Sequence, residues 1–357
     1  MKKPFYKMYD ELLSKTIISG SVSTEEYINQ NKSIINLVRN NIPKRLFRYR
    51  SCNEISIDAF KNNRIYFNSP NNFNDPNDSL IFINLKQIQE EFDSFNKNNF
   101  SEMIKHIIKT KEIPEYFKIL LPKEIINNIL SVTNKQFEKY INDNNIAHLL
   151  SYIEDKSYIN LNTLIRVIRS SVMISCFSEE IYQPLMWSYY ADSHKGFALE
   201  YDFTKIKHKC DNCQKICDDY LSFDLFPIVY TNHRYNATDY AKYILINDEY
   251  SRSGYLLSNN ILNTNPDQLA LKKICTYKAT CWKHEKEWRM ILRCILSKKY
   301  INWIECKPIA IYLGANISEI FNDILIKYAK NNEIDIFKMD LQMNNNEFKM
   351  CYNQIKD

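Results

Sequence analysis

The sequence predicts a mixed α+β fold in which a split sheet of mixed or antiparallel strands carries a helical insertion. Two observations predict this class. Short alternating or apolar runs, typical of strands, lie on both sides of residues 86–169, and that intervening segment is polar, rich in Asn and Lys, and helical in period. Hydrophobic residues make up 45% of the 357-residue chain, which is enough for a sizeable core.

The predicted elements divide the chain into five parts. These parts are N-terminal helices at 1–43, the first half of the core at 44–85, the helical insertion at 86–170, the second half of the core at 171–315, and a C-terminal helix and strand at 316–357. A capping box that starts at Ser23 opens the second N-terminal helix, which ends before Pro43. Strands are expected at 44–51, 64–68, 171–177, 197–201, 281–292, 309–314 and 334–339.

Composition excludes several classes of protein. The four glycines lie too far apart for a phosphate-binding glycine loop, so any nucleotide would be bound by side chains. The net charge of +5 is too small to indicate nucleic-acid binding by itself. No apolar run approaches the roughly 18 residues of a membrane span. Ten cysteines without a secretion signal indicate the cytoplasm.

The first half of the core carries two groups of polar candidates. Alternation over 44–51 places Arg48 and Arg50 on one strand face, which is either an exposed basic edge or one wall of an anion site, because arginine can bind phosphate oxygens bidentately. The loop at 69–78 is dense in turn-forming residues. Within it, Asp75 and Asp78 serve either the turn or a metal ion.

The second half of the core adds aromatic residues and a cysteine motif. Pro184 is expected in the first turn of a helix with Trp187 and Tyr190 on one face, followed by a polar turn that holds His194. Aromatic residues at helical spacing usually belong to the core. The motif His-x-Cys-x2-Cys-x3-Cys is either a zinc site or one buried face of a helix, and we expect no catalytic metal there; its residues are His208, Cys210, Cys213 and Cys217.

Residues 281–292 are the stretch around which the candidate site is organised. As a strand, this stretch places Lys283, Glu285, Glu287 and Arg289 on one face. Charged faces of this kind are usually solvated. Two neighbouring carboxylates also suit acid–base chemistry, because repulsion and burial raise one pKa while nearby cations keep the other group ionised.

Four blocks of residues give the chain a family resemblance. The blocks are Leu46-Phe47-Arg48-Tyr49-Arg50-Ser51, Phe73-Asn74-Asp75-Pro76-Asn77-Asp78, the segment from Met186 to Gly196, and Glu285-Lys286-Glu287-Trp288-Arg289. Over roughly residues 44 to 315 the chain resembles the bacterial family filed as domain of unknown function 2971. That family name supplies no reaction, but its setting implies a toxin or phage-defence effector, with a regulatory partner from such a system.

More distantly, the order of these motifs resembles that of ADP-ribosyltransferases. Those enzymes have a first strand with His or Arg, a second strand ending in Ser or Thr, an aromatic residue over the nicotinamide, and a late strand bearing Glu-x-Glu. Arg48 or Arg50, Ser69 and the pair Glu285 and Glu287 match these positions. The chain departs from the pattern because the Ser-Thr-Ser triplet is absent and no Gly follows the first arginine.

The resemblance implies that NAD is consumed as a substrate, without a metal, by transfer to an unknown protein or nucleic-acid acceptor or by hydrolysis. Glu287 would stabilise the oxocarbenium ion and Glu285 would contact the acceptor or water. The expected NAD-binding residues, which should converge on one cleft, are Arg48, Tyr49, Arg50, Ser69, Asn74, Asp75, Trp187, Tyr190, His194 and Arg289.

Two other functions are compatible with the sequence. A metal-dependent nuclease would use the carboxylates Asp75, Asp78, Glu285 and Glu287, with Lys286 or Lys283 near a phosphate. A sensor that is not an enzyme would bind a nucleotide or a partner protein. Dependence on Mg²⁺ or Mn²⁺ would favour the nuclease, and tight NAD binding without turnover would favour the sensor.

Overall fold

The computed structural model describes residues 4–20, 22–113, 122–137, 139, 161–204, 208–209, 216–217, 225–244, 266–293, 302–343 and 346–356. Its helices are α1 (Phe5–Lys15), α2 (Thr24–Arg39), α3 (Glu54–Lys61), η1 (Pro70–Asn72), α4 (Leu85–Thr110), α6 (Lys123–Ser131), η2 (Asn134–Gln136), α9 (Leu161–Ser170), α10 (Pro184–Tyr190), α13 (Ala270–Thr276), η3 (Thr280–Glu285) and α14 (Glu319–Asn331). The elements labelled η are 3₁₀ helices. Ser23 caps α2 through the predicted capping box.

The strands complete a mixed α+β fold, which confirms the predicted class. They are β1 (Leu46–Arg50), β2 (Arg64–Tyr66), β3 (Val172–Ser178), β4 (Phe197–Tyr201), β5 (His208–Lys209), β6 (Ile216–Cys217), β7 (Leu225–Pro227), β8 (Val229–Thr231), β9 (Tyr277–Ala279), β10 (Glu287–Arg293), β11 (Trp303–Glu305), β12 (Ala310–Leu313), β13 (Asp335–Leu341) and β14 (Met350–Gln354). The main sheet has the order β14-β13-β12-β4-β1-β3-β10-β7. Its one parallel pair is β12–β13, joined through α14, whereas its other pairs are antiparallel.

The sheet is split between β1 and β3. These two strands share the single registered pair Phe47↔Ser178. Further along β3, Ile174 pairs instead with Asn68, which follows β2, through backbone hydrogen bonds of 2.9 and 2.8 Å. The chain after β2 therefore lies beside β3 where β1 would otherwise continue.

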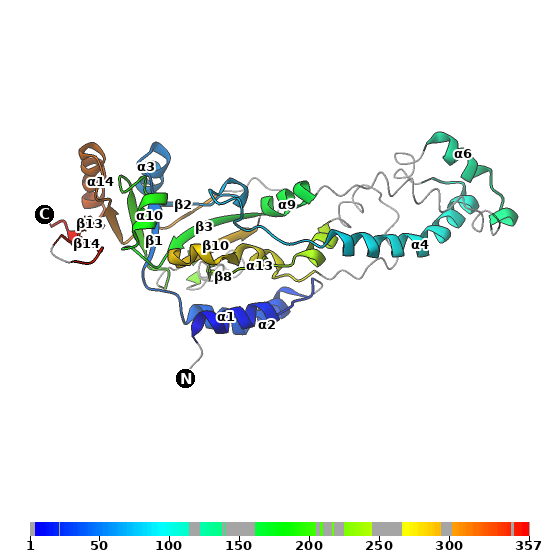
Figure 1. The fold of residues 1–357 in the computed structure, drawn as a ribbon, viewed down its shortest axis with the longest axis horizontal. Coiled ribbons are helices and arrows are strands. Elements are labelled where there is room, and N and C mark those ends of the chain that lie inside the picture. Colours follow the sequence, from blue (N-terminus) through cyan, green and yellow to red (C-terminus); the bar gives the residue numbers. More distant parts are fainter. Residues whose placement is uncertain are drawn as a thin grey trace.

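Helices cover both faces of the sheet (Figure 1). The helix α10 covers one face, where Trp187 packs edge-on against Tyr49 of β1. The helix α3 covers the other face, where Phe60 contacts Phe197 of β4. Figure 1 shows α4 and α6 extending away from the sheet at one end of the molecule. The described parts of the predicted insertion are mainly helical.

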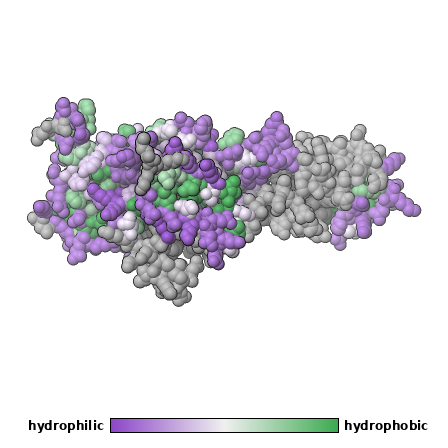
Figure 2. All heavy atoms as spheres, turned by 90° about the horizontal axis from the view of Figure 1, so that it is seen from below, coloured by the Kyte–Doolittle hydropathy of each residue, from purple (hydrophilic) through white to green (hydrophobic). Residues whose placement is uncertain are grey.

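The described surface is mixed in polarity. Figure 2 shows hydrophilic residues over most of the coloured part of one face, with hydrophobic residues gathered near its middle. Among the described residues, no helix combines the length and apolar character needed to cross a membrane.

The predicted strand at 281–292 is wrong in its first half. Residues Thr280–Glu285 form the 3₁₀ helix η3, and β10 begins only at Glu287. Between them Lys286 adopts a left-handed conformation with φ of 43°. That conformation breaks the strand alternation, so the two glutamates do not share a strand face in the predicted way.

Candidate functional site

Glu285 and Glu287 meet at the ammonium group of Lys278. Lys278 lies in β9, and its Nζ is 2.9 Å from Oε2 of Glu287 and in still closer contact with Oε2 of Glu285. The turn at Lys286 makes this possible, because it brings the end of η3 and the start of β10 around one cation. Glu285 is 2% exposed, so this is a buried cluster and not a solvated charged strand face.

Arg289 extends the cluster to the loop after η1. Its Nε donates to Oε1 of Glu287 at 2.7 Å, and its Nη1 donates to Oδ1 of Asp78 at 2.8 Å. Its Nη2 donates to the other oxygen of Asp78, so that pair is bidentate. Nη1 also donates to the Cys275 carbonyl at 2.8 Å. Arg289 is fully buried and is satisfied as an ion-pair partner, not directed toward a ligand.

The cluster shifts its two glutamates in opposite directions. Burial and then the neighbouring Glu287 raise the pKa of Glu285 to about 7, although Lys278 opposes this. Burial also acts to raise the pKa of Glu287, but Arg289 and Lys278 more than offset it and hold that pKa well below its usual range. With Asp78, the cluster contains three acids and two bases, so Glu285 is the acid that takes up a proton near neutral pH.

Two tyrosines complete the surroundings of the glutamates. The hydroxyl of Tyr190, at the end of α10, donates to Oε1 of Glu285 at 2.7 Å and also interacts with Asn74. Burial and the adjacent Glu285 raise the pKa of Tyr190 well above its usual range, so it stays a proton donor. The Tyr230 hydroxyl accepts a hydrogen bond of 2.8 Å from the backbone N–H of Glu287.

The strand register places Arg48 away from the two glutamates. Phe47, Ser178 and Glu287 are register partners across β1, β3 and β10, so their side chains share one face of the sheet. Arg48 alternates to the opposite face, where its guanidinium lies 5.8 Å from the centre of the Phe177 ring. Alternation places Arg50 on the same face, although Arg50 interacts electrostatically with Cys176, which in turn interacts with Glu287. The strands β1 and β10 are two strand spacings apart, roughly 10 Å, and the sheet lies between the Arg48 and Glu287 side chains.

Three further residues expected to bind NAD form part of the core around α10. Trp187 is fully buried, and its indole N–H donates to the Ile181 carbonyl at 2.7 Å, so neither ring face is open to a nicotinamide. Tyr49 packs against Trp187 and donates to the Glu180 carbonyl. The His194 ring is stacked on Trp187 with the ring centres 6.3 Å apart, and burial lowers the pKa of His194.

The candidates in the loop after β2 serve local structure. Ser69 caps η1 by accepting from the Asn71 N–H at 3.3 Å and donates to the Arg169 carbonyl. Asp75 accepts from the Asn77 N–H at 2.9 Å, as expected for a turn residue. Asn74 is the member of this group that reaches the cluster, through Tyr190.

The metal-binding alternatives gain no support from the described residues. Lys278 and Arg289 lie between the carboxylates of Asp78, Glu285 and Glu287, so cations of the chain already occupy the positions of a metal. Elsewhere in the described ranges no three His, Cys, Asp or Glu side chains are grouped to hold a metal ion. Lys283 is exposed and Lys286 pairs with Glu180.

The cysteine motif is only partly described. His208 and Cys217 are partners in the β5–β6 ladder, so the prediction of one helix through Cys217 is wrong. Cys210 and Cys213 lie outside the described residues.

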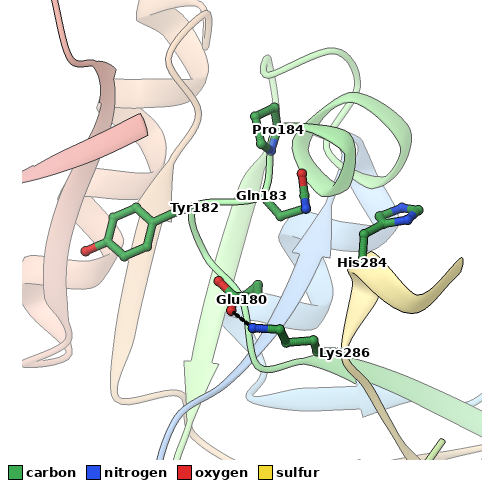
Figure 3. A pocket seen from close by; sticks show the side chains of 6 residues that line it. All are labelled: Glu180, Tyr182, Gln183, Pro184, His284 and Lys286. Atoms are coloured by element: carbon green, nitrogen blue, oxygen red, sulfur yellow. Dashed lines mark hydrogen bonds and ion pairs between the residues drawn. The ribbon is translucent and has the colours of Figure 1, made fainter. Parts of the chain in front are cut away.

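A pocket of about 260 Å³ opens beside the cluster (Figure 3). Its walls come from the segment between β3 and α10 and from the two residues on either side of Glu285. The lining residues are Glu180, Tyr182, Gln183, Pro184, His284 and Lys286. Hydrogen bonds from the Glu179 N–H to the Lys286 carbonyl, and from Ser178 Oγ to the Glu285 carbonyl, join the two walls.

Sequence reasoning missed Lys278 and Tyr230. No motif surrounds either residue, and each reaches the glutamates only through the short parallel ladder between β8 and β9. The charge count of the 281–292 stretch gives no signal for them, because Lys283, Lys286 and Arg289 already outnumber its two glutamates. A further cation is required only because both glutamates are buried, which the sequence does not show.

Comparison with known proteins matches part of the chain to a family model. Residues 186–290 match the model of the family described as "Protein of unknown function (DUF2971)". This range contains Tyr190, Lys278, Glu285, Glu287 and Arg289, whereas Asp78 and the strand β1 precede it. No curated protein and no solved structure matches the chain.

Proposed function

We propose that the chain is an enzyme that consumes NAD by cleaving the bond between nicotinamide and ribose. The observation that carries this proposal is the pair Glu285 and Glu287 on Lys278, one with a pKa of about 7 and the other held ionised. Carboxylate pairs tuned apart in this way are the usual machinery of glycosidic bond cleavage.

Each glutamate has a role that follows from its protonation state. The ionised Glu287 stabilises positive charge on the ribose as nicotinamide leaves with the bonding electron pair. Glu285, with a pKa near neutrality, accepts the proton of the attacking water or acceptor hydroxyl. Substrate entry requires η3 to move, because Trp282 of η3 covers Lys278 at 5.1 Å and the glutamates are buried. The split of the sheet at β1 and β3 supports a relation to the split sheet of ADP-ribosyltransferases.

The test is whether the purified chain, alone or with cell extract, depletes NAD. Glu287→Gln should lower turnover by about a hundredfold, on the scale of losing one charge partner of the transition state. The matched control is Glu112→Gln, at an exposed position outside the cluster, which should leave turnover unchanged. Equal activity of Glu287→Gln and the parent protein would refute the proposed mechanism.

Binding of NAD without turnover is the second candidate, and the burial of both glutamates favours it. In that case titration with NAD would show saturable binding while nicotinamide release stays at the level without protein. An effector role in a toxin or phage-defence system remains part of the proposal, to be tested by loss of cell growth on expression.

A further inference from the structure

The strand β14 forms one edge of the main sheet, at the end of the molecule opposite α6 (Figure 1). No strand of the described residues pairs with its outer side. On its inner side the Gln342 N–H donates to the Lys349 carbonyl at 3.0 Å, and the Ile355 N–H donates to the Ile336 carbonyl at 2.9 Å. The odd-numbered residues of this strand therefore bond to β13, and the alternate residues direct their N–H and C=O groups to the open edge. These outward residues are Met350, Tyr352 and Gln354.

This open edge lacks the features that usually keep sheet edges from pairing. Exposed edges are commonly blocked by proline, by charged side chains or by a covering element. The strand Met350–Gln354 contains no proline and no charged residue, whereas the strand at the opposite edge, β7, contains Pro227 and is buried. Beside β14, Phe348 and Met343 are the two most exposed large hydrophobic side chains among the described residues. An added strand would satisfy the open backbone groups and cover Phe348.

A second copy of the same strand fits this edge. Two identical edges pair antiparallel around a two-fold axis, so one surface serves both copies. An axis at Tyr352 uses all three outward residues, because Met350 then lies opposite Gln354 of the partner subunit and Tyr352 lies opposite itself. Each of these pairs exchanges two hydrogen bonds.

The charges that flank β14 are compatible with this register. Lys356 lies opposite Phe348 of the partner subunit, where an ammonium group and an aromatic ring attract each other. Lys349 forms an ion pair with Glu347 and lies opposite Ile355 of the partner subunit. No lysine therefore faces another lysine across the interface, and the strand between the lysines is uncharged.

We propose that two copies of the chain associate through β14 and form one continuous sheet. Tyr352 is stacked on Tyr182 with ring centres 5.5 Å apart, and Tyr182 lines the pocket beside Glu285 (Figure 3). The interface therefore borders the candidate site. Its formation does not depend on the proposed function.

The first test is the mass of the purified full chain, measured by light scattering over a range of protein concentrations. The expected mass is twice the 42.6 kDa of one chain. Gln354→Pro removes an N–H that points to the open edge and none that bonds to β13. This variant should weaken the dimer at least about tenfold, because the same hydrogen bond is lost from both copies. Its far-UV circular dichroism should stay that of the parent chain.

Cysteine variants test the register. With the axis at Tyr352, Asn353 lies opposite the free Cys351 of the partner subunit, in a pair without mutual hydrogen bonds whose Cα atoms are about 4.5 Å apart, close enough for a disulfide. Asn353→Cys should therefore give a covalent dimer in oxidised glutathione, and adding Cys351→Ser should abolish it. The matched control is Gln354→Cys, at the next exposed position, whose side chain lies on the other face and should give no such dimer.

The mass of a single chain at every concentration would overturn the inference and leave the edge to a strand of another protein. A dimer that Gln354→Pro leaves unchanged, or in which Asn353→Cys cross-links no better than Gln354→Cys, would use a different surface and would equally overturn it. If Gln354→Pro does not fold, the cross-linking comparison decides alone. Neither measurement involves NAD, so failure of this interface and failure of the proposed function are distinguishable.

Discussion

The substitution Glu285→Gln should make the stability of the protein less dependent on pH. Glu285 accepts one hydrogen bond from Tyr190 and one from Lys278. Glutamine can keep both contacts, with its carbonyl toward Lys278 and its NH₂ toward the tyrosine oxygen. The substitution therefore replaces a titrating acid with a neutral group of nearly the same shape.

The direction and size of the pH effect on stability follow from the raised pKa of Glu285. Its pKa rises from 4.5 to about 7 on folding, so the folded chain binds more protons than the unfolded chain between these values. The contribution of Glu285 to the free energy of unfolding is therefore largest below pH 4.5 and is lost as the pH rises through 7. Between pH 5 and 8 the loss is about 2–3 kcal/mol. The depressed pKa of Glu287 adds stability that stays constant over this range, because Glu287 is ionised throughout.

The assay is urea unfolding of the parent chain and of Glu285→Gln at several pH values from 5 to 8. The lowered pKa of His194 makes both proteins gain stability as pH rises, so its contribution cancels in the difference between them. The variant should gain about 2–3 kcal/mol on the parent from pH 5 to pH 8. A difference that stays constant within about 0.5 kcal/mol would show that Glu285 does not hold the proton, and the argument from the cluster would fail.

Two further substitutions test other parts of the structure by the same unfolding assay. Arg289→Met leaves two buried carboxylates without their main partner and should lower the free energy of unfolding by about 3–5 kcal/mol. The control Arg64→Met removes a partly exposed ion pair and should lower it by about 1 kcal/mol or less. Equal losses in the two variants would contradict the role of burial. Gly196→Ala places a Cβ 2.0 Å from the Arg50 carbonyl oxygen and should cost at least about 2 kcal/mol. Gly20→Ala meets a proline ring at 2.9 Å and should cost less, so the reverse order would show that the backbone near Gly196 yields easily.

The parts of the fold that were predicted correctly depend on local signals. The capping box at Ser23 and the strand β1 are read from a few adjacent residues, and both appear in the structure, although burial does not alternate along β1. The prediction of a strand over 281–292 was wrong because Lys286 adopts a left-handed conformation, which cannot be predicted from a lysine in the sequence. A single such residue changes which side chains share a face.

The composition of the site depended on contacts that local patterns do not contain. Glu285 and Glu287 were identified because two acids in one short stretch are visible in the sequence. Whether Arg48 joins them is decided by register across three strands, which alternation within one strand cannot supply. The pairing of β8 with β9 positions Lys278, and this pairing joins residues about fifty apart in the sequence.

The imbalance of the cluster argues for a role beyond stability. A buried ion network gains little over a well-packed apolar core even when acids and bases match. Here Asp78, Glu285 and Glu287 form ion pairs with Lys278 and Arg289, while Arg169 also interacts electrostatically with Asp78, and Glu285 is the acid with a pKa of about 7. Glutamine at that position would relieve the excess charge at little steric cost. An acid that weakens the fold at neutral pH, and lies between two residues of an open pocket, is better explained by proton transfer than by packing.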